Sequence, residues 1–182
     1  NPSCYLQEGE QAVLLAALME TDNAGRPLID AWSSRSGLSA DAWLEKLFEA
    51  TVIPFYHLLC RYGVALIAHG QNVTLVMKDY VPQRILLKDF QGDMRLVDED
   101  FPQARSLPDQ VKAVTARLSA DYIIHDLQTG NFVTVLRFIS RLTLQSGVSE
   151  TRFYQILAGV LHRYMAAHPE LAERFATFDL FK

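Results

Sequence analysis

The sequence is poor in cysteine, with only Cys4 and Cys60 among its 182 residues. Two thiols cannot form the disulfide framework of a small secreted domain, and they cannot supply the thiolates that hold an iron–sulfur cluster. The count therefore argues against redox chemistry on such a cluster. Reduced thiols in the cytoplasm are the simpler interpretation, so we expect a cytoplasmic protein.

Long apolar runs and an excess of positive charge are also missing. The longest clean apolar runs, 12–19 and 64–68, are far shorter than the ~18 residues of a membrane span. The formal net charge is −4, from 17 basic and 21 acidic residues, whereas nucleic-acid-binding domains usually carry a basic patch. We therefore expect neither a membrane nor a nucleic acid as a partner.

The sequence also lacks an initiator methionine and a signal peptide, and it stops just after a helical pattern. We expect a fragment of a longer protein, with part of any active site lying elsewhere. What is present suffices for a packed core, because 49% of the residues are hydrophobic and 21% are charged.

The first hundred residues predict helices and a small sheet. Ser39 is a candidate N-cap for a helix that Pro54 kinks or restarts and that Gly63 ends. A buried strand follows at 64–68. Two further runs, 73–77 and 84–87, predict a hairpin with a longer loop at 78–83, and 94–97 predicts a third short strand. The run 12–19 fits either a strand or a helix.

The rest of the chain is helical in pattern. An acidic, proline-bearing stretch after residue 97 predicts a linker, and apolar residues at helical spacing dominate from about residue 109. Gly130 and Asn131 could divide the segment 120–145 into two helices. The fold class is therefore α+β, a small antiparallel sheet with flanking helices followed by a helical lobe. We predict a palm-like part at 1–100 and the helical lobe at 101–182.

Polar side chains lie at both ends of the predicted hairpin. His69 and Asn72 precede it, and Asp89 follows it. An antiparallel hairpin returns to its starting end, so these three residues should converge. Amide and carboxylate oxygens suit Mg²⁺, and an imidazole can donate to a phosphate oxygen. Gly70 would let the backbone approach a ligand closely. The alternative is that the same residues only cap a turn.

The spacing of Asn72 and Asp89-Phe90 resembles half of the metal site of protein kinases. The kinase base, an Asp shortly before the Asn, is missing, and Gln71 cannot accept a proton from a hydroxyl. Transfer of a nucleotide to a group that is already anionic needs no such base. A carboxylate that attacks an α-phosphate fits this condition.

Three stretches carry a family resemblance: GVALIAHGQN at 63–72, RILLKDFQGDMRL at 84–96 and the opening YLQEGEQAVLLAALMETD. They resemble the C-terminal half of the IucA/IucC-type, NRPS-independent siderophore synthetases. The resemblance implies an ATP-dependent acid–amine ligase of siderophore biosynthesis. Such enzymes adenylate a carboxylate of citrate or a citryl intermediate and condense it with a hydroxamate-bearing amine such as N6-acetyl-N6-hydroxylysine. It allows for a homodimer in the full-length form.

The resemblance also implies site residues. By position these are His69, Asn72 and Asp89. To the predicted nucleotide-binding set we add Gln71 and Lys88, which lie beside them. Asp93, which flanks Gly92, is a further candidate Mg²⁺ ligand besides Asn72 and Asp89. Lys88 stands where many members have Arg, and Ile67 where some have Glu. Since further ATP-contacting residues of the family lie outside this sequence, we expect the fragment alone to be inactive.

Two other functions remain open from the sequence. A kinase-like phosphotransferase half-site would use the same Asn72 and Asp89, but no Gly-rich phosphate loop is present. A non-catalytic helical interaction module would use the amphipathic helices after residue 109. Pyrophosphate release that depends on citrate separates the ligase from the phosphotransferase, and retention of that activity in Asn72→Ala or Asp89→Ala would favour the helical module.

Overall fold

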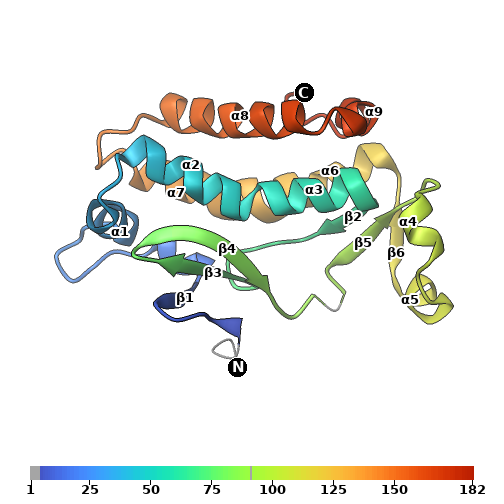
Figure 1. Ribbon diagram of the computed structural model, residues 1–182, viewed down its shortest axis with the longest axis horizontal. Coiled ribbons are helices and arrows are strands. Elements are labelled where there is room, and N and C mark those ends of the chain that lie inside the picture. The colour runs from blue at the N-terminus through green and yellow to red at the C-terminus, as the bar shows by residue number, and fades with distance from the viewer. Residues whose placement is uncertain (1–4, 91) are drawn as a thin grey trace.

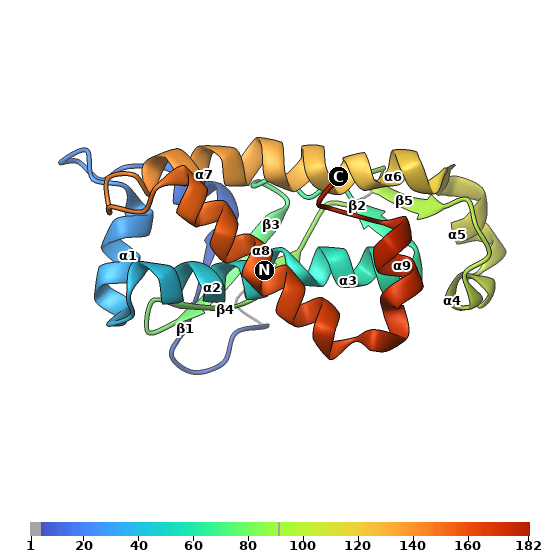
Figure 2. The same ribbon diagram turned by 90° about the horizontal axis from the view of Figure 1, so that it is seen from above.

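Three layers stack in the computed structural model, which describes residues 5–90 and 92–182. Two small sheets form the lowest layer in Figure 1, a layer of helices lies above them, and helix α8, Glu150–Ala167, lies on top. Seen from above in Figure 2, the middle layer is two roughly parallel rows of helix, and α8 crosses them obliquely. The predicted α+β class is confirmed.

Local sequence signals explain the front row of helices. Helix α1, Leu28–Ser36, is followed by α2, Ala40–Thr51, and the Oγ of Ser39 caps α2 by accepting a hydrogen bond from the Ala42 amide at 3.2 Å. Pro54 starts a new helix, α3, Ile53–Tyr62. Gly63 ends α3 with a φ of 65°, as predicted.

The first sheet is the predicted hairpin plus one strand. Strands β1, Glu10–Leu14, β3, Val73–Lys78, and β4, Val81–Leu87, pair antiparallel in the order β1-β3-β4. Only Asp79 and Tyr80 link β3 to β4, and their φ values of 52° and 63° fit a type I′ turn. The predicted longer loop is therefore wrong. The ambiguous run 12–19 divides into the end of β1 and a 3₁₀ helix, η2, Leu15–Met19.

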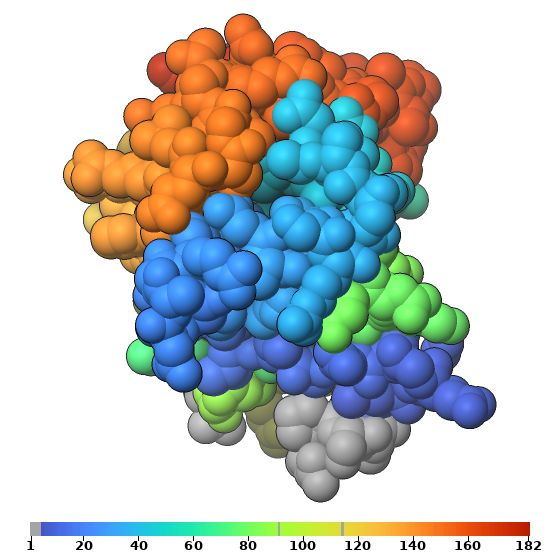
Figure 3. Space-filling model, turned by 90° about the vertical axis from the view of Figure 1, so that its left-hand side faces the viewer, coloured from blue at the N-terminus to red at the C-terminus, as the bar shows by residue number. Residues whose placement is uncertain are grey.

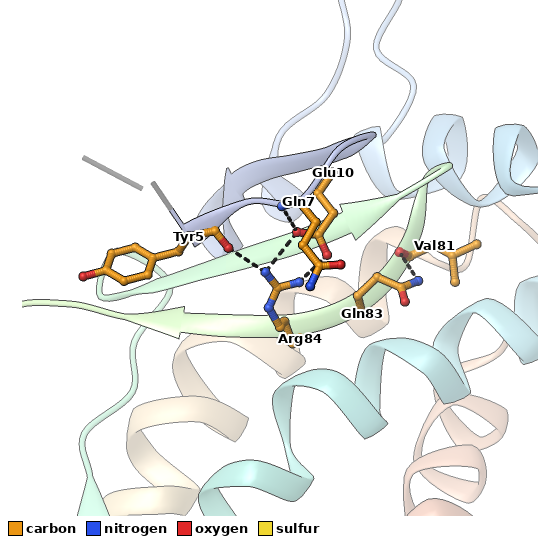
Figure 4. A network of polar contacts seen from close by, with 6 residues as sticks. All are labelled: Tyr5, Gln7, Glu10, Val81, Gln83 and Arg84. Carbon is orange, nitrogen blue, oxygen red and sulfur yellow. Dashed lines mark hydrogen bonds and ion pairs between the residues drawn. The ribbon is translucent and has the colours of Figure 1, made fainter. Parts of the chain in front are cut away.

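A polar network fastens β1 to the hairpin (Figure 4). The Arg84 guanidinium bonds to the Glu10 carboxylate, with Nη2 at 2.9 Å from Oε2, and it also donates to the Tyr5 carbonyl at 2.8 Å. The Glu10 side chain is only 6% exposed. The hydrogen bond from Arg84 lowers the pKa of this carboxyl group.

The second sheet departs from the prediction. Strand β5, Met94–Val97, is the expected short strand, but it pairs antiparallel with β2, Val64–Leu66, and not with the hairpin. A further strand, β6, Ala116–Leu118, adds in parallel on the other side of β5. Between β5 and β6 lie α4, Pro102–Arg105, and α5, Asp109–Val114.

The second row of helix runs without interruption through the expected break (Figure 2). Helix α6, Ala120–Leu127, continues as a π-helix, η3, Gln128–Leu136, and then as α7, Arg137–Leu142. The predicted division at Gly130 and Asn131 is wrong, because the chain widens to a π-helix there instead of ending. The last elements are η4, Pro169–Leu171, and α9, Ala172–Thr177.

One hydrophobic core joins the layers. Phe48 of α2 meets Phe153 of α8 edge to face, with ring centroids 5.0 Å apart, and both are fully buried. Polar contacts reinforce the end of the molecule seen in Figure 3, where the segment after α7 lies against α1 and Ser146 Oγ donates to Asp30. The boundary near residue 100 stays a prediction. Among the helices of the described residues, none is long and apolar enough to cross a membrane.

Candidate functional site

Two connecting loops form the candidate site. The first, 67–72, links β2 to β3, and the second, 88–93, links β4 to β5, so each loop passes from one sheet to the other (Figure 1). Backbone hydrogen bonds join the loops at both ends. The Ile67 amide donates to the Asp93 carbonyl at 3.0 Å, and the Lys88 amide donates to the Asn72 carbonyl at 3.1 Å. The hairpin thus returns the chain to its starting point, as predicted.

Three of the predicted side chains meet between these loops. The Asn72 Nδ2 lies 3.2 Å from His69 Nε2 and 3.2 Å from Asp93 Oδ2. Asn72 is 8% exposed, whereas His69 and Asp93 are half-buried. A buried amide needs partners for its hydrogens, and the imidazole and the carboxylate supply them. The structure therefore brings together His69, Asn72 and Asp93.

The other predicted residues lie at the rim. Asp89 adopts a left-handed backbone with a φ of 58°, and its carboxylate lies 3.6 Å from the Lys88 ammonium. The Lys88 and Asp89 side chains are 49% and 76% exposed, and Gln71 is exposed as well. No hydrogen bond in the described part of the chain joins the Asp89 side chain to His69 or Asn72. These charges are available to a solvent-borne ligand.

The donor set bears on the predicted Mg²⁺ site. Among residues 5–90 and 92–182, no group of three or more His, Cys, Asp or Glu side chains is close enough to hold a metal ion. Mg²⁺ in nucleotide sites commonly takes one or two carboxylates and completes its shell with waters and phosphate oxygens. One amide oxygen and a nearby carboxylate fit that pattern. The metal roles of Asn72, Asp89 and Asp93 stay a prediction.

Gly70 has a structural role that the sequence did not predict. Its carbonyl accepts a hydrogen bond from the Ala16 amide at 3.0 Å, and a Cβ on Gly70 would lie 3.0 Å from that same nitrogen. Gly70 thus permits a close approach to the backbone of η2, and its approach to a ligand stays a prediction. The glycine serves to seat the first loop on the 3₁₀ helix.

The π-helix η3 supports the first loop from another side, which sequence reasoning missed. A Cβ on Gly130 would lie 2.9 Å from the Ala68 nitrogen, so only glycine permits this approach. The next residue, Asn131, is 0% exposed, and neither of its amide atoms has a hydrogen-bond partner. A Gly-Asn pair inside an apolar helical pattern was the available signal, although it was interpreted as a break.

An open cleft of about 830 Å³ adjoins the second loop. The cleft is lined by Phe90, Gly92, Met94 and Arg95 and by Val111 and Thr115.

Asp126 of α6 has a buried carboxylate oxygen without a hydrogen-bond partner among the described residues. Burial raises the pKa of Asp126, and the positive charge of Arg95 opposes that rise.

Comparison with known proteins identifies the class first. Residues 41–182 match the family model described as ferric iron reductase FhuF-like transporter. Because this match covers more than half of the chain, the protein belongs to the FhuF-like family.

Individual relatives are more specific than the class. The whole chain is 63% identical to 31% of the length of aerobactin synthase from Escherichia coli. Over 97% of the chain, the identity is 38% with citryl-spermidine/3,4-dihydroxybenzoyl-citryl-spermidine:spermidine ligase of Bacillus anthracis, of which 31% is covered.

A solved structure agrees with these relatives. Aerobactin synthetase IucC from a hypervirulent pathotype of Klebsiella pneumoniae superimposes with a TM-score of 0.98 at 63% identity, over all of this chain and 33% of that one. The resemblance to IucA/IucC-type synthetases, and to aerobactin synthase among them, is confirmed. The chain spans about a third of the length of these relatives.

Proposed function

We propose that this chain is the C-terminal portion of a cytoplasmic, ATP-dependent siderophore synthetase. The synthetase adenylates a carboxylate of citrate, or of a citryl intermediate, and condenses it with an N6-acetyl-N6-hydroxylysine-type amine. The observation that carries the proposal is the convergence of His69, Asn72 and Asp93 between two loops, in a chain 63% identical throughout to aerobactin synthase.

Different site residues contact the metal ion and the phosphates of ATP. Asn72 through its amide oxygen, with the carboxylates of Asp89 and Asp93, would hold Mg²⁺. When bound, Mg²⁺ neutralises the charge of the phosphates as pyrophosphate leaves. His69 donates a hydrogen bond to a phosphate oxygen, and the exposed Lys88 ammonium and Gln71 amide contact the same polyanion from the rim.

The reaction needs no base at position 71. A citrate carboxylate is already anionic, so it attacks the α-phosphorus directly, and the bond from that phosphorus to the bridging oxygen breaks to release pyrophosphate. The amine then attacks the acyl carbon, and AMP leaves with the bonding electrons. Gln71 is therefore compatible with adenylation, whereas it does not suit phosphoryl transfer to a neutral hydroxyl.

The family description names a ferric iron reductase, and the sequence does not favour that chemistry. An iron–sulfur reductase needs several cysteine thiolates, and this sequence has two cysteines. Cys60 is buried, and burial raises the pKa of its thiol to about 12, which disfavours the thiolate that binds iron. We therefore assign this chain to the ligase side of the family.

Pyrophosphate release measured in the full-length synthetase tests the proposal. We expect release that requires citrate, with AMP as the nucleotide product, and a loss of about 10²-fold or more in kcat for Asn72→Ala and Asp89→Ala. Asp98→Ala, an exposed carboxylate beyond β5, is the matched control and should retain activity. The isolated 182-residue chain should release none.

Two results would contradict the proposal. Full activity in both Asn72→Ala and Asp89→Ala would remove these residues from the nucleotide site. ADP and phosphate as products would indicate a kinase-like phosphotransferase instead of an adenylating ligase.

A further inference from the structure

The partners of the Asn72 amide determine its orientation. Its Nδ2 lies 3.2 Å from Asp93 Oδ2 and 3.2 Å from His69 Nε2. If the amide were rotated by half a turn, its oxygen would face the carboxylate oxygen of Asp93 with no hydrogen between them. Two acceptors in contact repel each other, so the Asp93 charge holds the NH₂ group toward itself.

The orientation of the amide in turn fixes the imidazole. An amide NH₂ carries two hydrogens and cannot accept, so one hydrogen goes to Asp93 and the other to His69. The His69 Nε2 must then present its lone pair. In a neutral imidazole the other nitrogen, Nδ1, carries the proton.

We infer that Asp93, in addition to its proposed contact with Mg²⁺, is a positioning residue that acts through Asn72 to hold His69 in its Nδ1–H tautomer. The relay runs from the Asp93 carboxylate to the Asn72 amide and from there to the imidazole. His69 Nδ1 is the nitrogen that donates, and Nε2 cannot. The inference rests on the proposed function only where it assigns that donation to a phosphate oxygen of the nucleotide.

The relay also determines which atom of Asn72 remains for a ligand. Since Nδ2 is used by two partners, Oδ1 is directed away from both. No described residue donates a hydrogen bond to Oδ1. The Asp93 charge thereby presents one acceptor oxygen on Asn72 and one donor N–H on His69, which is the pair required by a cation and an anionic phosphate.

The backbone of Asp93 makes its side-chain role separable from its structural role. The Asp93 carbonyl accepts from the Ile67 amide at 3.0 Å, and its amide donates to the Phe90 carbonyl at 3.1 Å. Neither bond uses the carboxylate. Substitutions at this position can therefore remove the relay and leave the loop contacts in place.

The tautomer can be read directly on the 182-residue chain without nucleotide. Long-range ¹H–¹⁵N NMR of the uniformly ¹⁵N-labelled protein, at about pH 8.5 where imidazoles are neutral, distinguishes a protonated from an unprotonated ring nitrogen. We expect the Nδ1–H form of His69 as the major species. Asp93→Ala and Asn72→Ala should each reduce it to a minor species, because either change breaks the relay.

Two variants control the measurement. Asp93→Asn removes the charge and can face Asn72 with either its oxygen or its NH₂ group, so it should give a mixture of the two His69 tautomers. Asp98→Ala removes an exposed carboxylate outside the relay and should match the wild type. An Nε2–H major form in the wild type, or an unchanged His69 in a folded Asp93→Ala, overturns the inference. If Asp93→Ala does not fold, the wild-type spectrum alone tests the inference.

A second readout separates this inference from the proposed function. In the full-length synthetase, Asp93→Ala should lower kcat/KM for citrate-dependent pyrophosphate release by about tenfold or more. Saturating Mg²⁺ should not restore it, because the broken relay, unlike a weakened metal site, does not depend on the Mg²⁺ concentration. If the synthetase releases no pyrophosphate at all, the proposed function fails while the tautomer result stands. If release is normal in Asp93→Ala, the relay has no catalytic consequence and the inference fails.

Discussion

At the scale of single residues, His57 shows how burial lowers the pKa of an imidazole outside the candidate site. It lies on α3, half-buried, with Nδ1 2.7 Å from the Tyr164 hydroxyl and its ring centroid 5.7 Å from that of His168. Burial lowers the pKa of His57, and the nearby charges of His168 and Arg61 lower it further, against an opposite effect of Glu170.

This lowered pKa predicts a pH-dependent stability. The folded state binds fewer protons than the unfolded state between the folded pKa of His57 and its unfolded value near 6.5, so stability falls as the pH drops below about 6.5. Urea unfolding between about pH 8 and pH 5 measures it. His57→Gln should flatten this part of the curve, and an unchanged slope in that variant would contradict the assignment.

At the scale of elements, the π-helix η3 contacts the first loop of the candidate site. A π-helix forms i→i+5 hydrogen bonds and shifts the residues that follow around the helix axis. Gly130 sits in this wider turn and packs on the backbone of Ile67 and Ala68, which lead directly to His69. The helix thus supports the first loop from behind.

Gly130→Ala should therefore destabilise the protein by about 1–3 kcal/mol, because the new methyl group meets backbone atoms that cannot move freely. Gly159→Ala, inside α8, is the matched control. Its Cβ meets only the end of the Arg163 side chain at 3.7 Å, and alanine there should stabilise by about 0.5–1 kcal/mol. Chemical denaturation measures both, and equal effects would contradict the steric account.

Rules that depend on neighbouring residues predicted where helices and strands begin and end better than they predicted which strands pair. The Ser39 cap, the restart at Pro54 and the end at Gly63 depend on neighbouring residues, so the sequence alone was sufficient. The pairing of β5 with β2 and the addition of β6 depend on contacts between distant segments. Pro82 favours a loop in the sequence, whereas in the structure it lies inside β4 next to a bulge, so the turn has only two residues.

The candidate site, too, was predicted in part and missed in part. The return of the hairpin predicted that His69 and Asn72 would meet the chain that follows β4. The sequence favoured Asp89 as the carboxylate of this meeting, whereas the side chain that bonds to Asn72 is that of Asp93. Asp89 adopts a left-handed backbone, which the spacing of residues does not reveal.

At the scale of the whole molecule, α8 is one of the elements that join the two halves of the sequence. It packs on α2 through Phe153 and Phe48, and exposed ion pairs such as Arg152 with Asp41 at 2.7 Å border this contact. Exposed pairs contribute little, so the apolar contact dominates. We therefore expect residues 1–100 and 101–182 to unfold together.

Phe153→Ala tests this expectation. Loss of the buried ring should lower the free energy of unfolding by about 3–5 kcal/mol, and tryptophan fluorescence and helical circular dichroism should still report one coincident transition. Tyr154→Ala, its exposed neighbour, should cost much less. Two separate transitions would instead support independent units divided near residue 100.

The two loops of the candidate site have a mechanical consequence. Each is the direct covalent connection between the β1-β3-β4 sheet and the β2-β5-β6 sheet, and a side chain of each takes part in the Asn72–Asp93 hydrogen bond. Any tilt of one sheet against the other stretches that bond. A ligand that binds both loops therefore favours the arrangement in which this hydrogen bond is intact. Binding of the ligand and stiffening of the connection between the two sheets are then linked in one equilibrium.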